Sequence, residues 1–407
     1  MDPVIPVSPD SGIPLRAVPP ALRGFMRIAA HLRFGTLDLG LPDGRILRLE
    51  GLEPGPAAVL VLNAPNAFAR RLALGGDVGF AESHIAGDWD SPDLTGLIEL
   101  LALNRAAVEA AMPGGLAARL LGLLRALLNR NTRSRARRNA SAHYDLGNAF
   151  YAAWLDPTMT YSAAMFGPGD DLEAAQIRKY RVLAEATGIA QDHQVLEIGC
   201  GWGGFAAFAA REIGCRVTAL TVSAEQASHA AARVAAEGLA DRVEIRRQDY
   251  RDARGTFDRV IAIEMIEAVG EAHWPAFFET LRDRLAPGGR AGLQAITVRD
   301  DLFPAYRREH GFIRRSVFPG GMLPSPAVLA ELERGSGFAR RSERVFGADY
   351  ARTIAAWRER FRDAWPEIAG GRFDERFRRK WDYYLAYCEA GFRTGTIDVR
   401  QIVLERG

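Results

Sequence analysis

Strand-like and helix-like patterns of apolar residues alternate along the second half of the chain. Short apolar runs predict strands over residues 195–198, 216–221, 243–246, 259–263 and 290–298. Apolar residues at helical spacing predict helices over 205–211, 224–236 and 274–285 between them. Such a succession is typical of a parallel sheet covered by helices, so we expect an α/β domain. Further helices and a last strand, over 398–405, are expected after it.

The N-terminal part of the chain follows a different pattern. Residues 36–41 and 45–50 alternate apolar and polar positions around Pro42-Asp43-Gly44, which predicts a β-hairpin with a short turn. A strand over 57–62 and helices over 66–74 and 94–103 complete a small α+β domain. We therefore expect four parts: a loose Pro-rich segment 1–20, the α+β domain 21–104, a helical linker 105–140 and the α/β domain 141–407.

Two basic and apolar segments could meet a membrane. In the linker, residues 116–128 are mostly Leu and Ala, and five arginines follow over 130–138. An apolar helix that leads into arginines can lie on an anionic membrane surface, although a packed helix and a solvated linker explain the same pattern. The second segment, where a solvated helix face is the alternative, has four arginines around Phe312 and Ile313: Arg307, Arg308, Arg314 and Arg315.

Composition narrows the class of protein. The 407 residues are 48% hydrophobic and 25% charged, which suits folded domains with buried cores. A net charge of +2 gives no reason to expect nucleic acid as a partner. Three cysteines without regular spacing predict neither a disulfide framework nor a zinc site. We find no signal peptide and no apolar run long enough to span a bilayer, so we expect a cytoplasmic protein.

A glycine-rich turn over residues 197–204 joins the first strand of the α/β domain to its first helix. Glycines at such a turn let the backbone approach a ligand, and the helix that follows presents its positive end. Gly199, Gly201 and Gly204 also satisfy the dinucleotide spacing Gly-x-Gly-x-x-Gly. The glycines alone therefore predict only a nucleotide-like ligand.

Three neighbouring features favour S-adenosylmethionine over a dinucleotide. Glu197 stands two residues before Gly199, where a carboxylate suits a cationic amino-acid group and would repel a pyrophosphate. The second strand ends in Thr221-Val222-Ser223, without the acidic residue that usually binds a nicotinamide ribose, although Glu225 lies close by. Asp249 follows the third strand, where its carboxylate could accept a hydrogen bond from an adenine amino group.

Several separated blocks of sequence resemble one enzyme family. They are residues 143–148, 154–156, 159–162, 221–226, 248–252, 318–324, 383–392 and 397–401. By these blocks the chain, from about residue 22 to its end, resembles the cyclopropane-fatty-acid synthases, a family that includes mycolic-acid methyltransferases. The resemblance implies a Rossmann-like class I S-adenosylmethionine-dependent methyltransferase domain over 141–407, preceded by a small α+β N-terminal domain.

The resemblance also implies the reaction. Family members transfer the methyl group of S-adenosylmethionine to a cis double bond of an unsaturated phospholipid acyl chain, and a cyclopropane fatty acid is the expected product. The resulting carbocation needs an apolar tunnel, aromatic faces and a base. We therefore expect a peripheral enzyme at the inner face of the membrane. Its N-terminal domain would help in membrane docking or in forming a homodimer.

The family motifs assign residues to both parts of the site. For the cofactor they imply Tyr161, Ser162, Gly199, Gly201, Thr221, Gln226, Asp249 and Tyr250. For the base they imply a bound bicarbonate held by a cysteine after the Tyr-Ser pair, a glutamate, a histidine and a tyrosine. Glu267 matches the glutamate of this set and Tyr350 matches its tyrosine. Ile296 matches a backbone position near the anion.

Two positions of the bicarbonate set depart from the family. Ala163 replaces the cysteine and Gln294 replaces the histidine. Gln294 can donate a hydrogen bond but cannot carry charge, so an anion next to Glu267 would be held less well. We expect either bicarbonate held by fewer contacts or proton transfer to Glu267, directly or through water. The same departure makes a methyl- or methylene-branched chain, still unsaturated in some cases, the alternative to a cyclopropane.

Cys388 matches a cysteine that the family often carries, so it is a candidate catalytic residue. Methyl transfer to an alkene needs no thiol intermediate, and packing as a small hydrophobic residue is the simpler interpretation. Two other classes of function remain open. A small-molecule N- or O-methyltransferase would share the cradle but not the flanking blocks. A lipid-binding protein with a vestigial cofactor fold would not be expected to keep Gly199, Gln226 and Glu267 intact.

Overall fold

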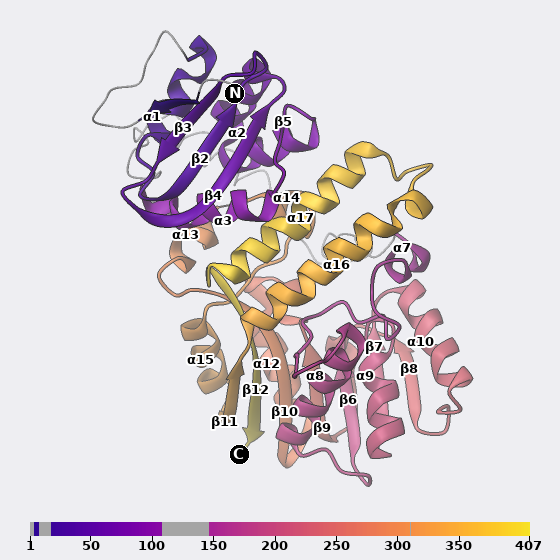
Figure 1. Ribbon diagram of the computed structural model, residues 1–407. Coiled ribbons are helices and arrows are strands. Elements are labelled where there is room, and N and C mark those ends of the chain that lie inside the picture. Colours follow the sequence, from indigo (N-terminus) through magenta and orange to yellow (C-terminus); the bar gives the residue numbers. More distant parts are fainter. Residues whose placement is uncertain (1–3, 8–17, 108–145, 310) are drawn as a thin grey trace. The chain divides into compact units, whose positions relative to one another are not determined.

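The computed structural model describes residues 4–7, 18–107, 146–309 and 311–407 (Figure 1). The predicted apolar helix 116–128, its arginines and His143 lie outside these residues. The chain forms two compact units, each described by itself below. Unit 1 combines Met1–Asn131 with Trp365–Thr394, and unit 2 combines Thr132–Ala364 with Gly395–Gly407.

Unit 1 contains a five-stranded sheet in the order β1-β3-β2-β4-β5. Its strands are β1 (Val4–Val7), β2 (Phe34–Gly40), β3 (Ile46–Glu50), β4 (Glu53–Leu62) and β5 (Trp89–Asp90). The predicted hairpin is confirmed, because Leu39 pairs with Leu47 and Gly40 with Ile46 in antiparallel register. The prediction of a loose N-terminus is wrong for Val4–Val7, since this strand pairs in parallel with β3.

The helices of unit 1 include a segment from the far end of the chain. They are α1 (Arg23–Ala29), α2 (Pro65–Ile85), α3 (Leu94–Leu103) and α17 (Glu375–Arg393). Helix α2 is interrupted at Gly76, whose φ of 56° is not helical, so a first helical segment ends close to the predicted end and a second one follows. Thr95 donates a 2.8 Å hydrogen bond to Glu389, and Arg379 donates one of 2.7 Å to Asp90. Residues 365–394, which we expected in the α/β domain, therefore pack with the N-terminal domain instead.

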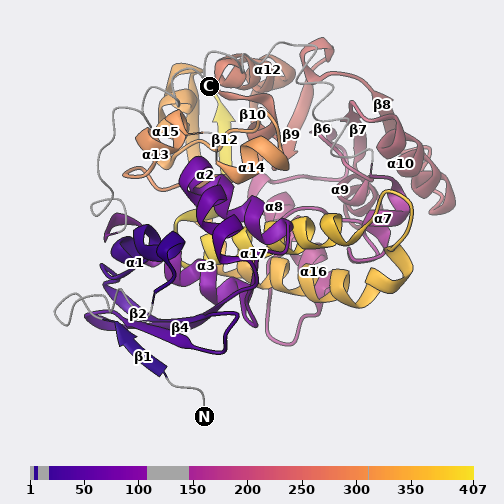
Figure 2. The ribbon, with the colours of Figure 1, turned by 90° about the horizontal axis from the view of Figure 1, so that it is seen from above.

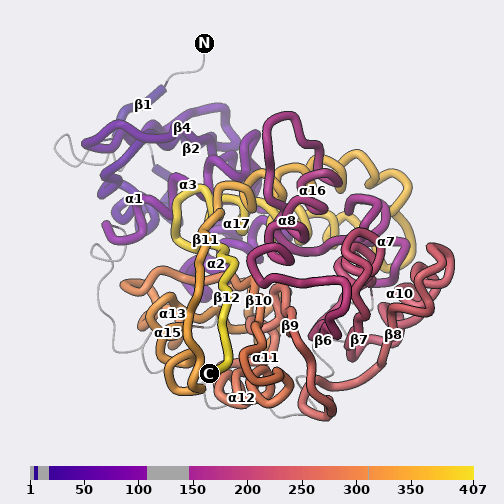
Figure 3. Tube along the Cα trace, turned by 90° about the horizontal axis from the view of Figure 1, so that it is seen from below, coloured from indigo at the N-terminus to yellow at the C-terminus, as the bar shows by residue number. Residues whose placement is uncertain are grey.

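Unit 2 contains a seven-stranded sheet in the order β11-β12-β10-β9-β6-β7-β8, which Figure 3 shows from below. Its strands are β6 (Gln194–Ile198), β7 (Arg216–Thr221), β8 (Val243–Arg247), β9 (Phe257–Ile263), β10 (Leu285–Val298), β11 (Phe338–Val345) and β12 (Ile397–Arg406). Strands β6 to β10 run parallel, as predicted, and β12 is antiparallel to β10 and β11. The sequence did not indicate β11, because half of the residues of this edge strand are charged and most are exposed.

Helices cover both faces of this sheet. The main ones are α8 (Leu172–Thr187), α9 (Gly204–Phe208), α10 (Ala224–Ala236), α12 (Trp274–Arg284) and α15 (Pro326–Gly335). Helices α12 and α15 lie on one face and α8 on the other (Figure 2). The shorter α7 (Asn148–Ala152), α11 (Ile266–Val269), α13 (Phe303–Arg308) and α14 (Phe312–Ser316), and the long α16 (Gly347–Ile368), complete the order. Two apolar clusters of buried residues, one on each face, form the core of the unit.

The order of the strands reverses next to β6, which makes the carboxyl end of the sheet the expected ligand-binding edge. From β6 the chain moves to β7 and β8 on one side, and then returns to β9 on the other side of β6. Ligands of open α/β sheets bind where the strand order reverses in this way. The segments after β6, β7, β8 and β9 carry most of the residues that the sequence assigned to cofactor and base.

The arginines near α13 and α14 have varied surroundings. Phe312 is buried in the core, and Arg307 forms a 2.7 Å ion pair with Glu271. Arg308 and Arg315 are exposed. Among the residues with a described position, none forms a helix long and apolar enough to cross a membrane.

We predict that the hydrogen bonds of the Asn104 side chain contribute to the stability of unit 1. Its Oδ1 accepts hydrogen bonds from the backbone of Arg33 (2.7 Å) and Phe34 (2.9 Å), and its Nδ2 donates to Phe34 O and Leu100 O. Asn104→Ala would remove these hydrogen bonds from partly buried backbone groups and should cost about 2–4 kcal/mol. Urea unfolding measures this loss. Asn63→Ala, at an exposed position, should cost less than about 1 kcal/mol, and equal losses would contradict the account.

Candidate active site

The glycine-rich turn after β6 forms an open cradle. Gly199, Gly201 and Gly203 adopt φ values of 83°, 53° and 84°, in the left-handed region that favours glycine. The backbone N–H groups of Gly199 and Cys200 donate to Leu220 O on β7, at 2.9 and 2.8 Å, which fixes the turn to the sheet. A Cβ built on Gly201 would meet no atom within 4 Å. The turn is therefore rigid on the sheet side and open on the other.

Glu197 supplies a buried carboxylate at the end of β6. Its Oε2 has no hydrogen-bond partner among the described residues, and burial raises the pKa of the carboxyl to about 8. A buried acceptor without a partner is unfavourable, so a ligand that donates a hydrogen bond to it would be stabilised. A cationic amino group forms the strongest hydrogen bond of this kind. The cradle and Glu197 therefore fit the amino-acid part of S-adenosylmethionine, as the sequence predicted.

The ribose and adenine positions are less open than the sequence suggested. Thr221 at the end of β7 donates a 2.8 Å hydrogen bond to the amide oxygen of Gln226. Arg251 donates to both carboxylate oxygens of Asp249, at 2.8 and 2.6 Å, so any bond from adenine would share this carboxylate. The ring of Tyr250 packs edge-to-face on Phe277 in the core, which leaves mainly its backbone for contact with a ligand.

Tyr161 and Ser162 lie in surroundings of opposite character. The ring of Tyr161 belongs to a cluster of aromatic side chains with centroids 5.3 to 5.5 Å apart: Tyr151, Trp154 and Trp357. Ser162 instead accepts a 2.7 Å hydrogen bond from the Nζ of Lys179, a buried lysine on α8. Burial lowers the pKa of Lys179 to about 7, and the negative charge of Glu264 is the largest opposing influence. Lys179 has no role among the sequence-based predictions, although it is one of only two lysines in the chain.

A carboxylate that the sequence analysis missed lies where the bicarbonate was expected. Glu264 follows β9 directly, and its Oε1 accepts hydrogen bonds of 2.8 Å from Ala163 N and from Gln294 Nε2. Its Oε2 accepts a 2.7 Å hydrogen bond from the hydroxyl of Tyr350 on α16. These three donors stand at the positions that the family motifs assign to cysteine, histidine and tyrosine. They are engaged by Glu264, so they do not fit a separate bicarbonate ion.

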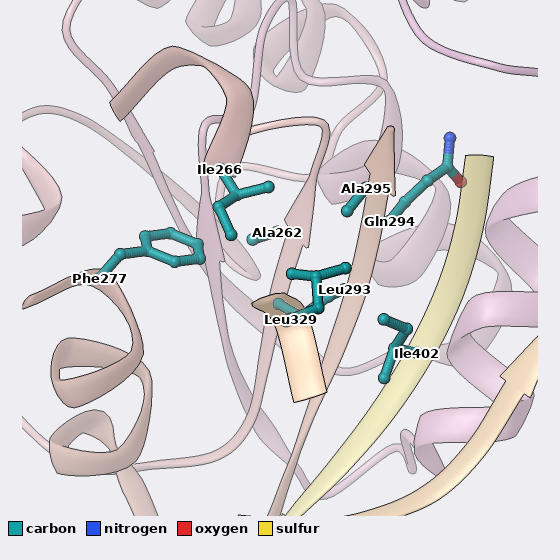
Figure 4. A pocket seen from close by; sticks show the side chains of 8 residues that line it. All are labelled: Ala262, Ile266, Phe277, Leu293, Gln294, Ala295, Leu329 and Ile402. Atoms are coloured by element: carbon teal, nitrogen blue, oxygen red, sulfur yellow. The ribbon is translucent and has the colours of Figure 1, made fainter. Parts of the chain in front are cut away.

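The amide of Gln294 is fixed from both ends. Its Nε2 donates to Glu264, and its Oε1 accepts a 3.1 Å hydrogen bond from Gln401 on β12. In Figure 4 this amide points away from a small apolar cavity lined by its strand neighbours Leu293 and Ala295. Adjacent strand residues face opposite sides of a sheet, so the cavity belongs to the core on the other face. It is no part of the polar cluster around Glu264.

Glu267 lies near Glu264 but has fewer donors. Its Oε1 accepts a 2.5 Å hydrogen bond from Ile296 N, and its Oε2 has no partner in the described part of the chain. Burial, followed by the charge of Glu264, raises the pKa of Glu267 to about 8. Burial also raises the pKa of Glu264, but its three donors and Lys179 oppose this shift. Glu264 is therefore the carboxyl that ionises first, and Glu267 keeps its proton at neutral pH.

Sequence reasoning singled out Glu267 because the family motif contains it. The signal for Glu264 was its place directly after a buried strand, next to the point where the strand order reverses. Glu264 and Glu267 stand three residues apart at this edge, and the sequence-based prediction included only the second of them.

Cys388 lies on α17. Burial raises the pKa of the Cys388 thiol to about 12, so it carries no thiolate at neutral pH. This observation favours the structural interpretation.

The open side of Gly201 predicts a specific loss of cofactor binding. Gly201→Ala should strain the backbone by about 1–2 kcal/mol and place a methyl group where the cofactor approaches. S-adenosylmethionine affinity, measured by calorimetry, should fall by about tenfold or more. Gly238→Ala is the matched control, because Gly238 also has a positive φ (68°) and no atom within 4 Å of an added Cβ. It should lose similar stability and keep its affinity; equal affinities in both variants would be evidence against the cradle.

The thiol of Cys388 should be dispensable for chemistry. We expect Cys388→Ala to keep the kcat of methyl transfer within about threefold, with any loss appearing in thermal stability. A folded variant that loses nearly all turnover would instead give the thiol a catalytic role.

Comparison with known proteins agrees with this architecture. The sequence model of the family described as Mycolic acid cyclopropane synthetase matches residues 131–402. The chain is 39% identical to Tuberculostearic acid methyltransferase UfaA1 of Mycobacterium tuberculosis over 406 residues, which cover 97% of this chain and 93% of the relative. It is 36% identical to Cyclopropane-fatty-acyl-phospholipid synthase of Escherichia coli over 353 residues, 86% of this chain and 88% of the relative.

Solved structures give the same result for the fold. Mycolic acid cyclopropane synthase CmaA1, complexed with SAH and CTAB, superposes with a TM-score of 0.63 at 28% identity. The cyclopropane synthase MmaA2 from Mycobacterium tuberculosis gives a TM-score of 0.62 at 29% identity. Each alignment covers 66% of this chain and 98% of the solved chain. The chain thus belongs to the mycolic acid cyclopropane synthetase family, and it is an S-adenosylmethionine-dependent C-methyltransferase with a Rossmann-like fold.

Proposed function

We propose that this enzyme methylates a cis double bond in an acyl chain of an unsaturated phospholipid and forms a methyl- or methylene-branched chain. The observation that carries the proposal is the carboxylate of Glu264, held by three donors close to a wall of aromatic rings. Two relatives support a fatty-acyl acceptor, since their names are Tuberculostearic acid methyltransferase and Cyclopropane-fatty-acyl-phospholipid synthase.

An alkene acceptor explains the character of the site. The bound S-adenosylmethionine supplies an electrophilic methyl group, and an alkene is a weak nucleophile that becomes a carbocation when it takes this group. Aromatic faces such as those of Tyr161 and Trp357 stabilise a cation and exclude water. A nearby base must then remove a proton. A small-molecule N- or O-methyltransferase needs neither the aromatic wall nor a desolvated carboxylate, so the geometry favours carbon as the acceptor.

The product depends on which proton leaves. Loss from the added methyl group with ring closure gives a cyclopropane, whereas loss that forms a new double bond gives a branched chain. The sequence alone favoured a cyclopropane. Ala163, Glu264 and Gln294 together depart from the bicarbonate site of that reaction, and a relative that spans 97% of this chain is named for a different fatty-acid methylation. Both observations favour the branched product. A cyclopropane is the second candidate, favoured by the family description and by the Escherichia coli relative.

The lipid acceptor suggests where the enzyme works. We propose a peripheral enzyme that takes its phospholipid from the inner face of the membrane, in keeping with the family resemblance. The exposed Arg308 and Arg315 suit anionic headgroups. A homodimer is proposed on the family resemblance alone.

Methyl transfer to vesicles of defined composition tests the proposal. Phosphatidylglycerol with oleoyl chains should gain one CH2 unit per modified chain in the presence of S-adenosylmethionine. Proton NMR should detect signals of an exocyclic methylene or a methyl branch, which unreacted oleoyl chains lack, without the high-field protons of a cyclopropane.

Two controls define the acceptor. Vesicles with fully saturated chains should give no transfer, because they offer no π electrons. A cyclopropane as the main product would replace the branched assignment by the second candidate, and no transfer to any unsaturated phospholipid would refute the proposed acceptor.

A further inference from the structure

We propose that Glu264 is the built-in proton acceptor of this enzyme and takes the place of a bound bicarbonate ion. The inference rests on the proposed methylation of an acyl double bond. It differs from the sequence-based expectation, which gave this role to bicarbonate or to Glu267.

The three donors of the cluster surround a carboxylate as they would surround a bound anion, and this carboxylate is the side chain of Glu264. Ala163 N and Gln294 Nε2 donate to one oxygen of Glu264, and the Tyr350 hydroxyl donates to the other. Carboxylate and bicarbonate share a planar O–C–O group that accepts such bonds. Ala163 and Gln294 are therefore adaptations to this side chain. A small residue offers its N–H, and a neutral amide donates without adding a charge that would compete for the proton.

One lone pair of the carboxylate is left for chemistry. An ionised carboxylate has about four lone-pair sites on its two oxygens. Two of those on Oε1 and one on Oε2 accept the hydrogen bonds described above. The remaining site on Oε2 can take a proton, while the three donors hold the carboxylate in position.

The backbone of Glu264 is held in an uncommon conformation for this purpose. Its φ of 52° lies in the left-handed region, and only one other non-glycine residue of the described ranges, Met159, shares a positive φ. The Glu264 N–H donates a 2.7 Å hydrogen bond to Gln294 O on the neighbouring strand. Strain of this kind persists where the surroundings fix it, and it is concentrated at functional sites.

The charges around Glu264 suit a base. Glu267 is neutral at neutral pH and so does not repel a carboxylate. The Tyr350 hydroxyl donates to Glu264, and Lys179 is the cation that influences it. Lys179 also interacts with Asp156 and Glu197, whose charges favour its protonated form. Desolvation raises the pKa of the Glu264 carboxyl and so its affinity for a proton, whereas the three donors favour its ionised form.

The proposed reaction transfers a methyl group and then a proton. The π electron pair of the acyl double bond forms the new carbon–carbon bond to the methyl group, and the electron pair of the broken sulfur–carbon bond stays on sulfur. The neighbouring chain carbon becomes cationic. Glu264 then removes a proton from a carbon near the cation, and the electron pair of that C–H bond forms a new double bond or closes a ring. Glu264 releases its proton to water when the product leaves.

The test uses the full enzyme, oleoyl phosphatidylglycerol vesicles, and buffers with and without bicarbonate. Wild-type turnover should be unchanged within about twofold when bicarbonate is removed. Glu264→Gly keeps a residue that tolerates the positive φ and opens space for a small anion. It should lose about a hundredfold or more of kcat. Added bicarbonate or formate should restore about tenfold of this loss, which a merely structural role would not allow.

Control variants keep the test decisive. S-adenosylmethionine affinity of Glu264→Gly, measured by calorimetry, shows whether unit 2 is intact. Glu264→Gln should lose kcat to a similar extent and also lose the rise of kcat with pH that ionisation of Glu264 produces. Glu267→Gln, the neutral counterpart of a protonated carboxyl, should lose much less.

Each failure has a distinct meaning. Wild-type activity that disappears without bicarbonate and returns with it would overturn the inference. Glu264→Gln turnover within about fivefold of wild type would do the same. Absence of transfer by the wild-type enzyme to any unsaturated phospholipid would instead refute the proposed function on which the inference rests.

Discussion

The desolvation of a carboxylate at the end of β9 is the constraint on which the site depends. A carboxylate taken out of water costs several kcal/mol unless hydrogen bonds replace its hydration. Three separate segments provide these bonds to Glu264: the loop with Ala163, strand β10 with Gln294 and helix α16 with Tyr350. Because Gln294 is in turn held by Gln401 on β12, the sheet itself fixes the base. Glu267 is buried with weaker support, and burial raises its pKa to about 8, so it is protonated at neutral pH.

The parallel sheet brings this base and the cofactor cradle to one edge. The glycine turn follows strand β6 and Glu264 follows β9, and these two strands are neighbours in the sheet. The carboxyl ends of parallel strands lie at the same edge, so the cofactor cradle and the proposed proton acceptor are brought to one edge of the sheet. Lys179 on α8 interacts electrostatically with both Glu197 and Glu264, which links the two parts of the site.

Much of this could be predicted from the sequence, because the signals were local. Apolar periodicity indicated strands β6 to β10, and the turn over residues 197–204 indicated the cradle. Signals that depend on tertiary packing were missed. Glu264 gains its role from donors about 30 to 100 positions away in sequence, and α17 gains its place in unit 1 from α2 and α3. The charged edge strand β11 has no apolar pattern to detect. Asp249 is the reverse case, because its position in the sequence suggested a residue free to bind adenine. In the structure its carboxylate also accepts a hydrogen bond from Arg251.

The most direct test of the central claim is a crystal structure of the enzyme with S-adenosylhomocysteine, grown in the presence of bicarbonate. The account predicts that the Glu264 carboxylate accepts hydrogen bonds from Ala163 N, Gln294 and Tyr350, with no separate anion among these donors. A planar bicarbonate bound to the same three donors, with Glu264 turned away, would contradict it.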